Sequence, residues 1–103
     1  MAHKPAATDD LLLRMALGIA LVSLRKRRGL LQQDVARQLK TTGAHLSNIE
    51  RGGGNPKFSM IYQISEILKI SPGALMRETM RNFRRLKNTW AIPKELKKAD
   101  HGA

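Results

Sequence analysis

Residues that could form hydrogen bonds at close range gather in one short stretch of the chain, residues 41–54. If residues 43–51 form a helix, its outward face carries only residues that are small or can hydrogen-bond: Gly43, Ala44, His45, Ser47, Asn48 and Arg51. Such a face would not obstruct close approach to a nucleic-acid groove, and it supplies donors and acceptors for base edges and phosphates. The chemistry expected here is recognition.

We expect no catalysis from the same residue types. Ser47 has no neighbour at a spacing that suggests a general base, and the carboxylates show no acid–base arrangement. The histidines, His3, His45 and His101, are too scattered to suggest a metal site, and cysteine is absent. We therefore predict a protein that is not an enzyme and that has no metal and no cofactor.

The overall charge points to a polyanionic partner. Lys and Arg outnumber Asp and Glu by 19 to 8 in 103 residues, a formal net charge of +11. Nucleic acid is the most common partner of so basic a small chain, and a membrane surface is the main competitor. One Trp, one Tyr and two Phe leave little aromatic surface on which single-stranded bases could stack.

The longest apolar run, residues 11–24, is too short to span a bilayer. It has 14 residues, whereas about 20 are needed, and Arg14 interrupts it. Asp9 and Asp10 precede the run and a basic cluster follows it, which is the wrong polarity for a signal peptide. We expect a single cytoplasmic domain without a membrane or a small-molecule ligand as partner.

Helical periodicity extends over most of the chain, and no segment reads as a strand. The first helix is predicted from about Asp9 to Arg28, with acids in its first turn, cations in its last turn and Gly29 as its stop. Further helices are predicted over 32–40, 43–51, about 57–70 and a short turn from Pro72. An amphipathic helix follows to about Trp90, and Pro93 disfavours its continuation.

Residues 32–52 have the features of a helix-turn-helix. Two short helices are separated by the Thr41–Thr42 break, and Thr42 is expected to cap the second. Ala36 is small where the helices would cross, and a glycine ends the unit. With its flanks, the segment resembles the Cro/CI-repressor type of helix-turn-helix domain over about residues 17–76. The matching residues are Leu17, Gly18, Leu24, Arg25, Gly29, Leu30, Gln32, Ala36, Leu46, Ser47, Ile49, Glu50, Gly52, Asn55, Pro56, Ile64 and Leu68.

The resemblance implies an all-α fold: a five-helix domain like that of lambda repressor, here with an extra C-terminal amphipathic helix. It implies that the third helix enters the DNA major groove, and that Glu50 holds Arg25 in a structural role. The expected base contacts fall on Gly43, Ala44, His45, Ser47 and Asn48. The expected phosphate contacts fall on Gln32, Gln33, Lys40, Thr42, Arg51 and Asn55.

The chain departs from the family pattern in several places. Lys40 replaces a glycine usual at the turn and is expected to tolerate a positive φ, and Gly43 and Ala44 replace long polar side chains. Base reading is therefore expected to shift towards Asn48, His45 and Ser47, or towards DNA shape. The basic segment from Arg77 lies beyond the usual domain.

We divide the chain into a flexible tail (1–8), the helix-turn-helix domain (9–76) and a basic extension (77–103), helical to about residue 90 and then disordered. The first helix carries a surplus apolar stripe, and the extension offers a complementary one. Packing one on the other, within the chain or swapped between subunits, would bury both. We expect a homodimer whose interface includes Leu12, Met15, Ile19, Val22, Met80, Phe83 and Trp90.

The expected function is sequence-specific binding of double-stranded DNA, as a transcriptional repressor on a palindromic operator in a bacterium, phage or plasmid. Two roles within the same class stay open, a restriction–modification controller and an antitoxin, and the latter would add a toxin or another regulator as partner. A protein-interaction module without DNA binding is the alternative from another class. For the basic extension, a packing helix is favoured over a DNA- or membrane-binding one.

Overall fold

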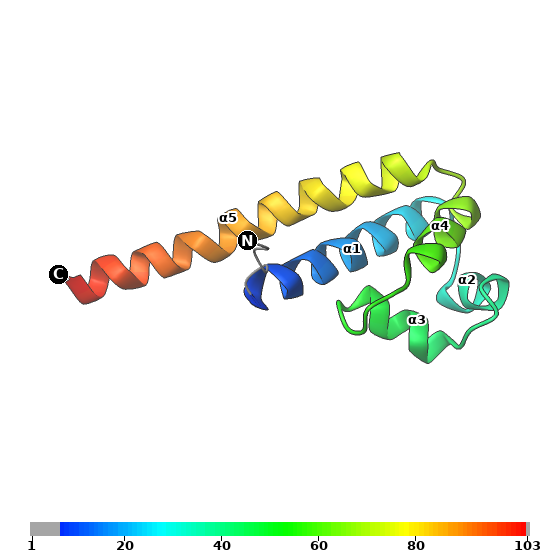
Figure 1. Ribbon diagram of the computed structural model, residues 1–103, viewed down its shortest axis with the longest axis horizontal. Helices are drawn as coiled ribbons and strands as arrows, with labels where there is room; N and C mark the ends of the chain where they lie inside the picture. Colours follow the sequence, from blue (N-terminus) through cyan, green and yellow to red (C-terminus); the bar gives the residue numbers. More distant parts are fainter. Residues whose placement is uncertain (1–6, 103) are drawn as a thin grey trace, which may run out of the picture.

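The computed structural model describes residues 7–102, with side chains described over 9–89. Five helices make up the fold, and the described residues include no strand: α1 (Ala7–Arg27), α2 (Gln32–Gln38), α3 (Gly43–Glu50), α4 (Phe58–Ile67) and α5 (Pro72–Gly102). The predicted all-α class and the order of the helices are confirmed (Figure 1). Most of the predicted flexible tail, residues 1–6, lies outside the described residues.

The ends of α1 follow the charge pattern of the sequence. Asp9 and Asp10 lie in its first turn and Arg25, Lys26 and Arg27 in its last turn, where each charge opposes that of the helix end. Gly29 follows at φ 68°, a left-handed conformation that ends the helix. The predicted stop is therefore confirmed, although α1 begins at Ala7, two residues before the predicted start.

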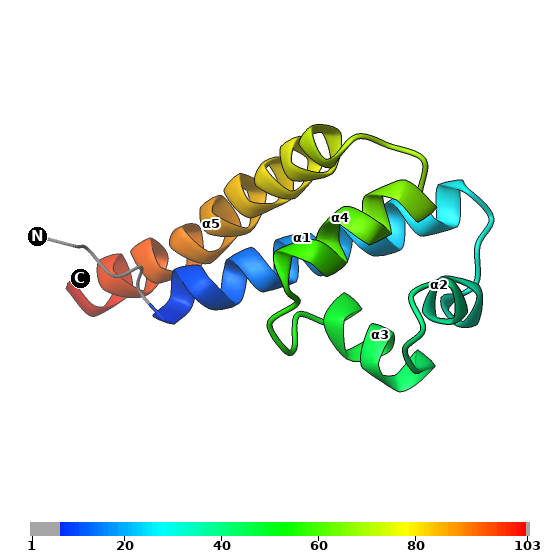
Figure 2. The same ribbon diagram turned by 45° about the vertical axis from the view of Figure 1, so that its right-hand side comes forward.

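α1 is the central helix of the molecule. α5 runs antiparallel to it along one side, while α3 lies on the opposite side of α1 in both views (Figures 1 and 2). α2 and α4 lie towards the C-terminal end of α1. The helix-turn-helix is therefore on the side of α1 that α5 does not cover. α5 and α3 are therefore separated by α1 and lie on opposite sides of the molecule.

Two buried apolar clusters hold this arrangement together. The larger joins four helices and contains Leu17, Ala20, Leu21, Ile49, Ile64, Leu68 and Leu75. The smaller contains Val35, Ala36 and Leu46 and packs α2 against α3. Small Ala36 is buried at that crossing, as its place in the sequence predicts, because close-packed helices leave no room for a larger side chain there.

Backbone groups of neighbouring helices also contact α1 directly. A Cβ atom on Gly18 would lie 2.3 Å from the carbonyl oxygen of Glu50, so only glycine lets α3 approach so closely. Directly after the C-terminal end of α1, the Arg28 guanidinium donates to the carbonyl oxygens of Leu68 (2.8 Å) and Lys69 (3.0 Å). Arg28 thereby satisfies groups that the end of α4 leaves without a helical partner.

The C-terminal extension differs from the prediction in its continuity. The short helix from Pro72 and the amphipathic helix from Arg77 form one unbroken α5, which packs on α1 within the same chain. The prediction of a helix end near Trp90 is wrong, because α5 continues through Pro93 to Gly102. Residues 94–99, which follow Pro93, are Lys, Glu, Leu and Ala, all of which have a high helix propensity and favour continuation of the helix.

α5 covers only part of the apolar surface of α1. Leu12 is 1% exposed inside the chain, so its assignment to a dimer interface is wrong; its side chain is already packed. Ile19 (42%) and Leu11 (40%) stay exposed, and Met15 and Val22 are half-buried. The expectation that packing of the extension would bury the surplus apolar stripe of α1 is therefore met only in part, because Leu12 is buried and Ile19 is not.

Candidate nucleic-acid interface

α2, the turn after it and α3 form the predicted helix-turn-helix. The turn passes through Lys40 at φ 57°, and the Thr41 amide donates to the carbonyl oxygen of Ala36 (2.9 Å), a glycine-type helix ending made by a lysine. Thr42 then begins α3, since its hydroxyl oxygen accepts from the His45 amide at 3.0 Å. The positive φ predicted for Lys40 and the cap predicted for Thr42 are both confirmed.

α3 presents one buried and one open face. Leu46, Ile49 and Glu50 are buried against the rest of the domain. The open face is formed by exposed residues, namely Gly43, Ala44, His45, Asn48 and Arg51, with half-buried Ser47 at its side. A Cβ on Gly43 would meet nothing within 4 Å, so this edge of the helix is bare, as the small residues predict.

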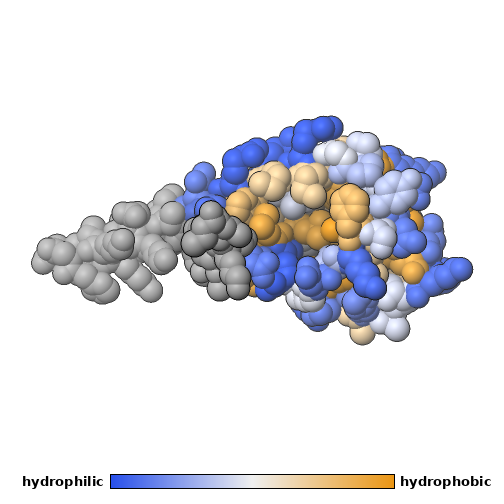
Figure 3. All heavy atoms as spheres, viewed as in Figure 1, coloured by the Kyte–Doolittle hydropathy of each residue, from blue (hydrophilic) through white to orange (hydrophobic). Residues whose placement is uncertain are grey.

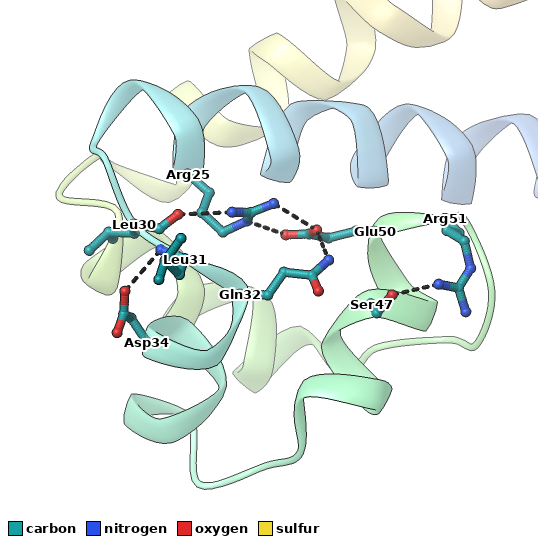
Figure 4. Close-up of polar contacts among 8 residues, drawn as sticks. All are labelled: Arg25, Leu30, Leu31, Gln32, Asp34, Ser47, Glu50 and Arg51. Carbon is teal, nitrogen blue, oxygen red and sulfur yellow. Dashed lines mark hydrogen bonds and ion pairs between the residues drawn. The ribbon is translucent and has the colours of Figure 1, made fainter.

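A buried ion pair fixes α3 against α1 (Figure 4). The Arg25 guanidinium donates to both carboxylate oxygens of Glu50, at 2.7 and 3.2 Å, and to the carbonyl oxygen of Leu30 at 2.8 Å. Side-chain exposure is only 11% and 4% for the two partners. Glu50 therefore holds Arg25, as the family resemblance implies.

Gln32 joins the same network. Its amide donates to Glu50 at 2.6 Å, and the side chain is half-buried between α2 and α3 (Figure 4). Gln32 was expected to contact a phosphate, but in this structure its side chain is hydrogen-bonded to the Glu50 carboxylate. This hydrogen bond links α2 to α3. Gln33, the next residue, is exposed and free of this constraint.

Arg51, at the C-terminal end of α3, folds back onto its own helix. Its guanidinium donates to the Ser47 hydroxyl one turn earlier, and Arg51 remains exposed (Figure 4). The Arg51 guanidinium has five N–H donors and therefore offers further donors on the open face.

The three glycines after α3 serve different purposes. Gly52 (φ 87°) and Gly54 (φ 70°) adopt the left-handed conformation, and Gly52 also lies against the Met15 backbone. Gly53 has no positive φ, but a Cβ there would lie 2.3 Å from the Oδ1 atom of Asn48. The Asn48 amide therefore lies against the glycine loop.

A hollow of about 340 Å³ adjoins the open face of α3. It brings together His45 and Asn55, which are expected from the sequence to contact DNA, with three residues for which no such role was expected, Lys57, Ser59 and Gln63. These three follow the Asn55–Pro56 turn and carry donors suited to phosphate oxygens. The signal that could have identified them is a cation and a hydroxyl directly after that turn, at the start of α4.

A second group of exposed cations lies on α5, on the other side of α1. Arg77, Arg81, Arg84, Arg85 and Lys87 are exposed along that helix. Arg81 donates to Glu78 at 2.6 Å, and this hydrogen bond lowers the pKa of the Glu78 carboxyl. On α4, a hydrogen bond to Glu66 raises the pKa of the Tyr62 hydroxyl.

Over the described part of the chain, no helix is both long enough and apolar enough to cross a membrane. The same residues contain no group of three or more His, Asp or Glu side chains placed to hold a metal ion.

Comparison with known proteins agrees with this geometry. The helix-turn-helix domain family matches residues 18–79, more than half of the chain. An uncharacterized HTH-type transcriptional regulator, y4dJ of Sinorhizobium fredii, is 30% identical over 67 residues, which cover 65% of this chain and 87% of that protein.

Two solved structures share the fold. The clp gene regulator ClgR of Corynebacterium glutamicum superimposes with a TM-score of 0.77 at 23% identity, over 84% of this chain and 93% of that one. The restriction–modification controller protein C.Esp1396I, solved as a tetramer with its natural 35-base-pair operator, gives 0.62 at 20% identity, over 69% and 93%.

Proposed function

The chain belongs to the helix-turn-helix domain family, of the Cro/CI-repressor type, and we propose from this that it represses transcription by binding a palindromic operator in double-stranded DNA as a homodimer. Its family and fold are those of DNA-binding transcription regulators. A protein with this task acts where the DNA is, in the cytoplasm of a bacterium or of a cell that hosts a phage or plasmid.

One observation carries the proposal: the open face of α3 is exposed and carries only side chains that are small or can form hydrogen bonds. Asn48 lies at the centre of that face and offers an amide that can pair with an adenine edge. Arg51, Lys40 and Thr42 lie around it and are exposed, in positions suited to phosphates. Base contacts would set the sequence, and phosphate contacts would set register and salt dependence.

Substitutions at Asn48 and Arg51 test the proposal. Selection from random duplex DNA would first identify the bound sequence, its symmetry and the spacing of its half-sites. Asn48→Ala should then reduce discrimination at one base pair of each half-site by about 1–3 kcal/mol. Arg51→Ala should weaken binding to all sequences about equally and lower the log–log salt slope by about 0.9.

Arg81→Ala is the matched control, because Arg81 is an exposed arginine on α5, across α1 from the open face. It should leave the selected sequence unchanged. If the wild-type chain retains no duplex DNA at low salt, the proposal is wrong and the protein-interaction alternative replaces it.

A second candidate role within this class is that of a restriction–modification controller, which is the role of C.Esp1396I, a protein of the same fold. This role differs from that of another repressor in the DNA it binds, since a controller would bind upstream of restriction and modification genes. Mapping the bound sites on the source genome distinguishes them.

A further inference from the structure

Gly53 occupies a position at which glycine is not required by the backbone. Its neighbours Gly52 and Gly54 have φ values of 87° and 70°, which side chains other than glycine rarely adopt, whereas Gly53 has no positive φ. Its amide donates to the carbonyl oxygen of Asn48 at 2.8 Å, a hydrogen bond that any residue except proline would make. Alanine would therefore fit the local backbone.

The obstacle to a side chain at residue 53 is the end of one other side chain. A Cβ there would lie 2.3 Å from Oδ1, 2.8 Å from Cγ and 3.0 Å from Nδ2 of Asn48. Gly54 adds to the same site, since its Cβ position lies 3.5 Å from Nδ2. The Asn48 amide thus occupies the volume that a methyl group on residue 53 would fill.

We propose that Gly53 is a specificity-determining residue: its missing side chain sets the orientation in which Asn48 is presented to a base pair. This inference rests on the proposed function, because it takes Asn48 as the base-reading residue. The terminal atoms of Asn48 are flexible, so a methyl group at residue 53 rotates the amide away instead of unfolding the loop. A bidentate contact to a base needs both amide atoms in one plane with the base edge, and the rotated amide no longer supplies it.

A double-mutant cycle with two readouts tests the inference. Wild type, Gly53→Ala, Asn48→Ala and the double variant are compared by affinity for the selected duplex and for duplexes altered at the base pair that Asn48 reads. Gly53→Ala should reduce discrimination at that base pair about tenfold, and it should have no further effect in the Asn48→Ala background. Its thermal midpoint should match that of the wild type.

The second readout needs no DNA. The side-chain amide resonances of Asn48, identified by their loss in Asn48→Ala, should shift in Gly53→Ala. They should stay in place in Gly73→Ala, a matched change on α5. Asn48 resonances that do not move, discrimination that does not change, or an equal change in the Asn48→Ala background would each overturn the inference.

The two readouts separate this inference from the proposed function. If no variant, including the wild type, binds duplex DNA, the proposed function fails and the specificity role of Gly53 falls with it. If the wild type binds selectively and Gly53→Ala keeps the same base preference, the inference alone fails.

Discussion

Two lysines adopt a backbone conformation that usually belongs to glycine. Lys40 follows the C-terminal end of α2 at φ 57°, and Lys69 follows that of α4 at φ 58°. A residue with a side chain is strained there by about 1–2 kcal/mol. Lys40 lies beside the proposed DNA-binding face, whereas Lys69 lies at the junction of α4 and α5.

Replacing each lysine by glycine separates strain from function. Lys40→Gly and Lys69→Gly should each raise the free energy of unfolding by about 1 kcal/mol, because glycine relieves the strain. Only Lys40→Gly should weaken DNA binding, with a salt slope lower by about 0.9, since one phosphate contact is lost. Urea denaturation and salt-dependent binding measure the two effects, and an equal loss of affinity in both variants would contradict the assignment of Lys40.

Glu50 balances a buried positive charge, so its loss should be costly. Glu50→Ala leaves the Arg25 guanidinium and the Gln32 amide without their shared acceptor. We expect the free energy of unfolding to fall by about 3–5 kcal/mol in urea denaturation.

Glu78→Ala is the matched control, because its ion pair lies within α5, where the Arg81 side chain is 57% exposed and the Glu78 side chain 19% exposed. It should cost less than about 1 kcal/mol. Because Arg81 lowers the pKa of Glu78, that small contribution is present above the ordinary glutamate pKa and is lost as the pH falls through the lowered value. A Glu50→Ala variant as stable as this control would show that the buried pair does not hold α3.

At the scale of the helices, α5 is part of the domain core as well as an extension of it. Leu75 is fully buried in the larger cluster, and the Asn82 amide donates to the carbonyl oxygen of Ala16 at 3.3 Å. α5 thus supports α1, which in turn holds α3 through Gly18 and Arg25.

Leu75→Ala should therefore destabilise the whole domain. We expect a loss of about 2–5 kcal/mol in the free energy of unfolding, measured in urea, because the substitution leaves a cavity in a packed core. Met76→Ala, the next residue on the same helix, is 43% exposed and should cost less than about 1 kcal/mol. Similar costs for the two variants would argue against α5 as a core element.

At the scale of the molecule, apolar surface remains uncovered. Figure 3 shows an apolar area between α5 and α1 with hydrophilic residues around it. A groove of about 240 Å³ there is lined by residues that include Leu13, Leu17, Ile61 and Met76. Exposed Leu11 and Ile19 add further apolar surface on α1, and Met80 and Phe83 are half-buried on α5; the side chain of Trp90, also assigned to the interface, lies outside the described residues.

The proposed homodimer makes this surface testable. Ile19→Glu should raise the dimer dissociation constant at least about tenfold in sedimentation velocity, because the interface would bury an unpaired charge. Leu31→Glu makes the same change at an exposed apolar residue at the start of α2, outside the proposed interface, and should leave the dimer intact. A dimer that survives Ile19→Glu would place the interface elsewhere.

The sequence alone determined the helices of the helix-turn-helix and the end of α1, because the residues that begin and end a helix lie close to it in the sequence. The Thr42 cap, the Gly29 stop and the bare edge at Gly43 and Ala44 depend on residues within one or two turns of each other. The pairing of Arg25 with Glu50 followed from family resemblance, since these residues are 25 positions apart and no local pattern links them.

The tertiary structure decided what depends on contacts between distant segments. It placed α5 on one side of α1, which buried Leu12 and left Ile19 exposed, although both belong to the same apolar stripe in the sequence. It held Gln32 on Glu50 and brought His45 beside Lys57. Periodicity shows that a helix face is apolar but not which neighbour covers it, because that depends on how all five helices pack together.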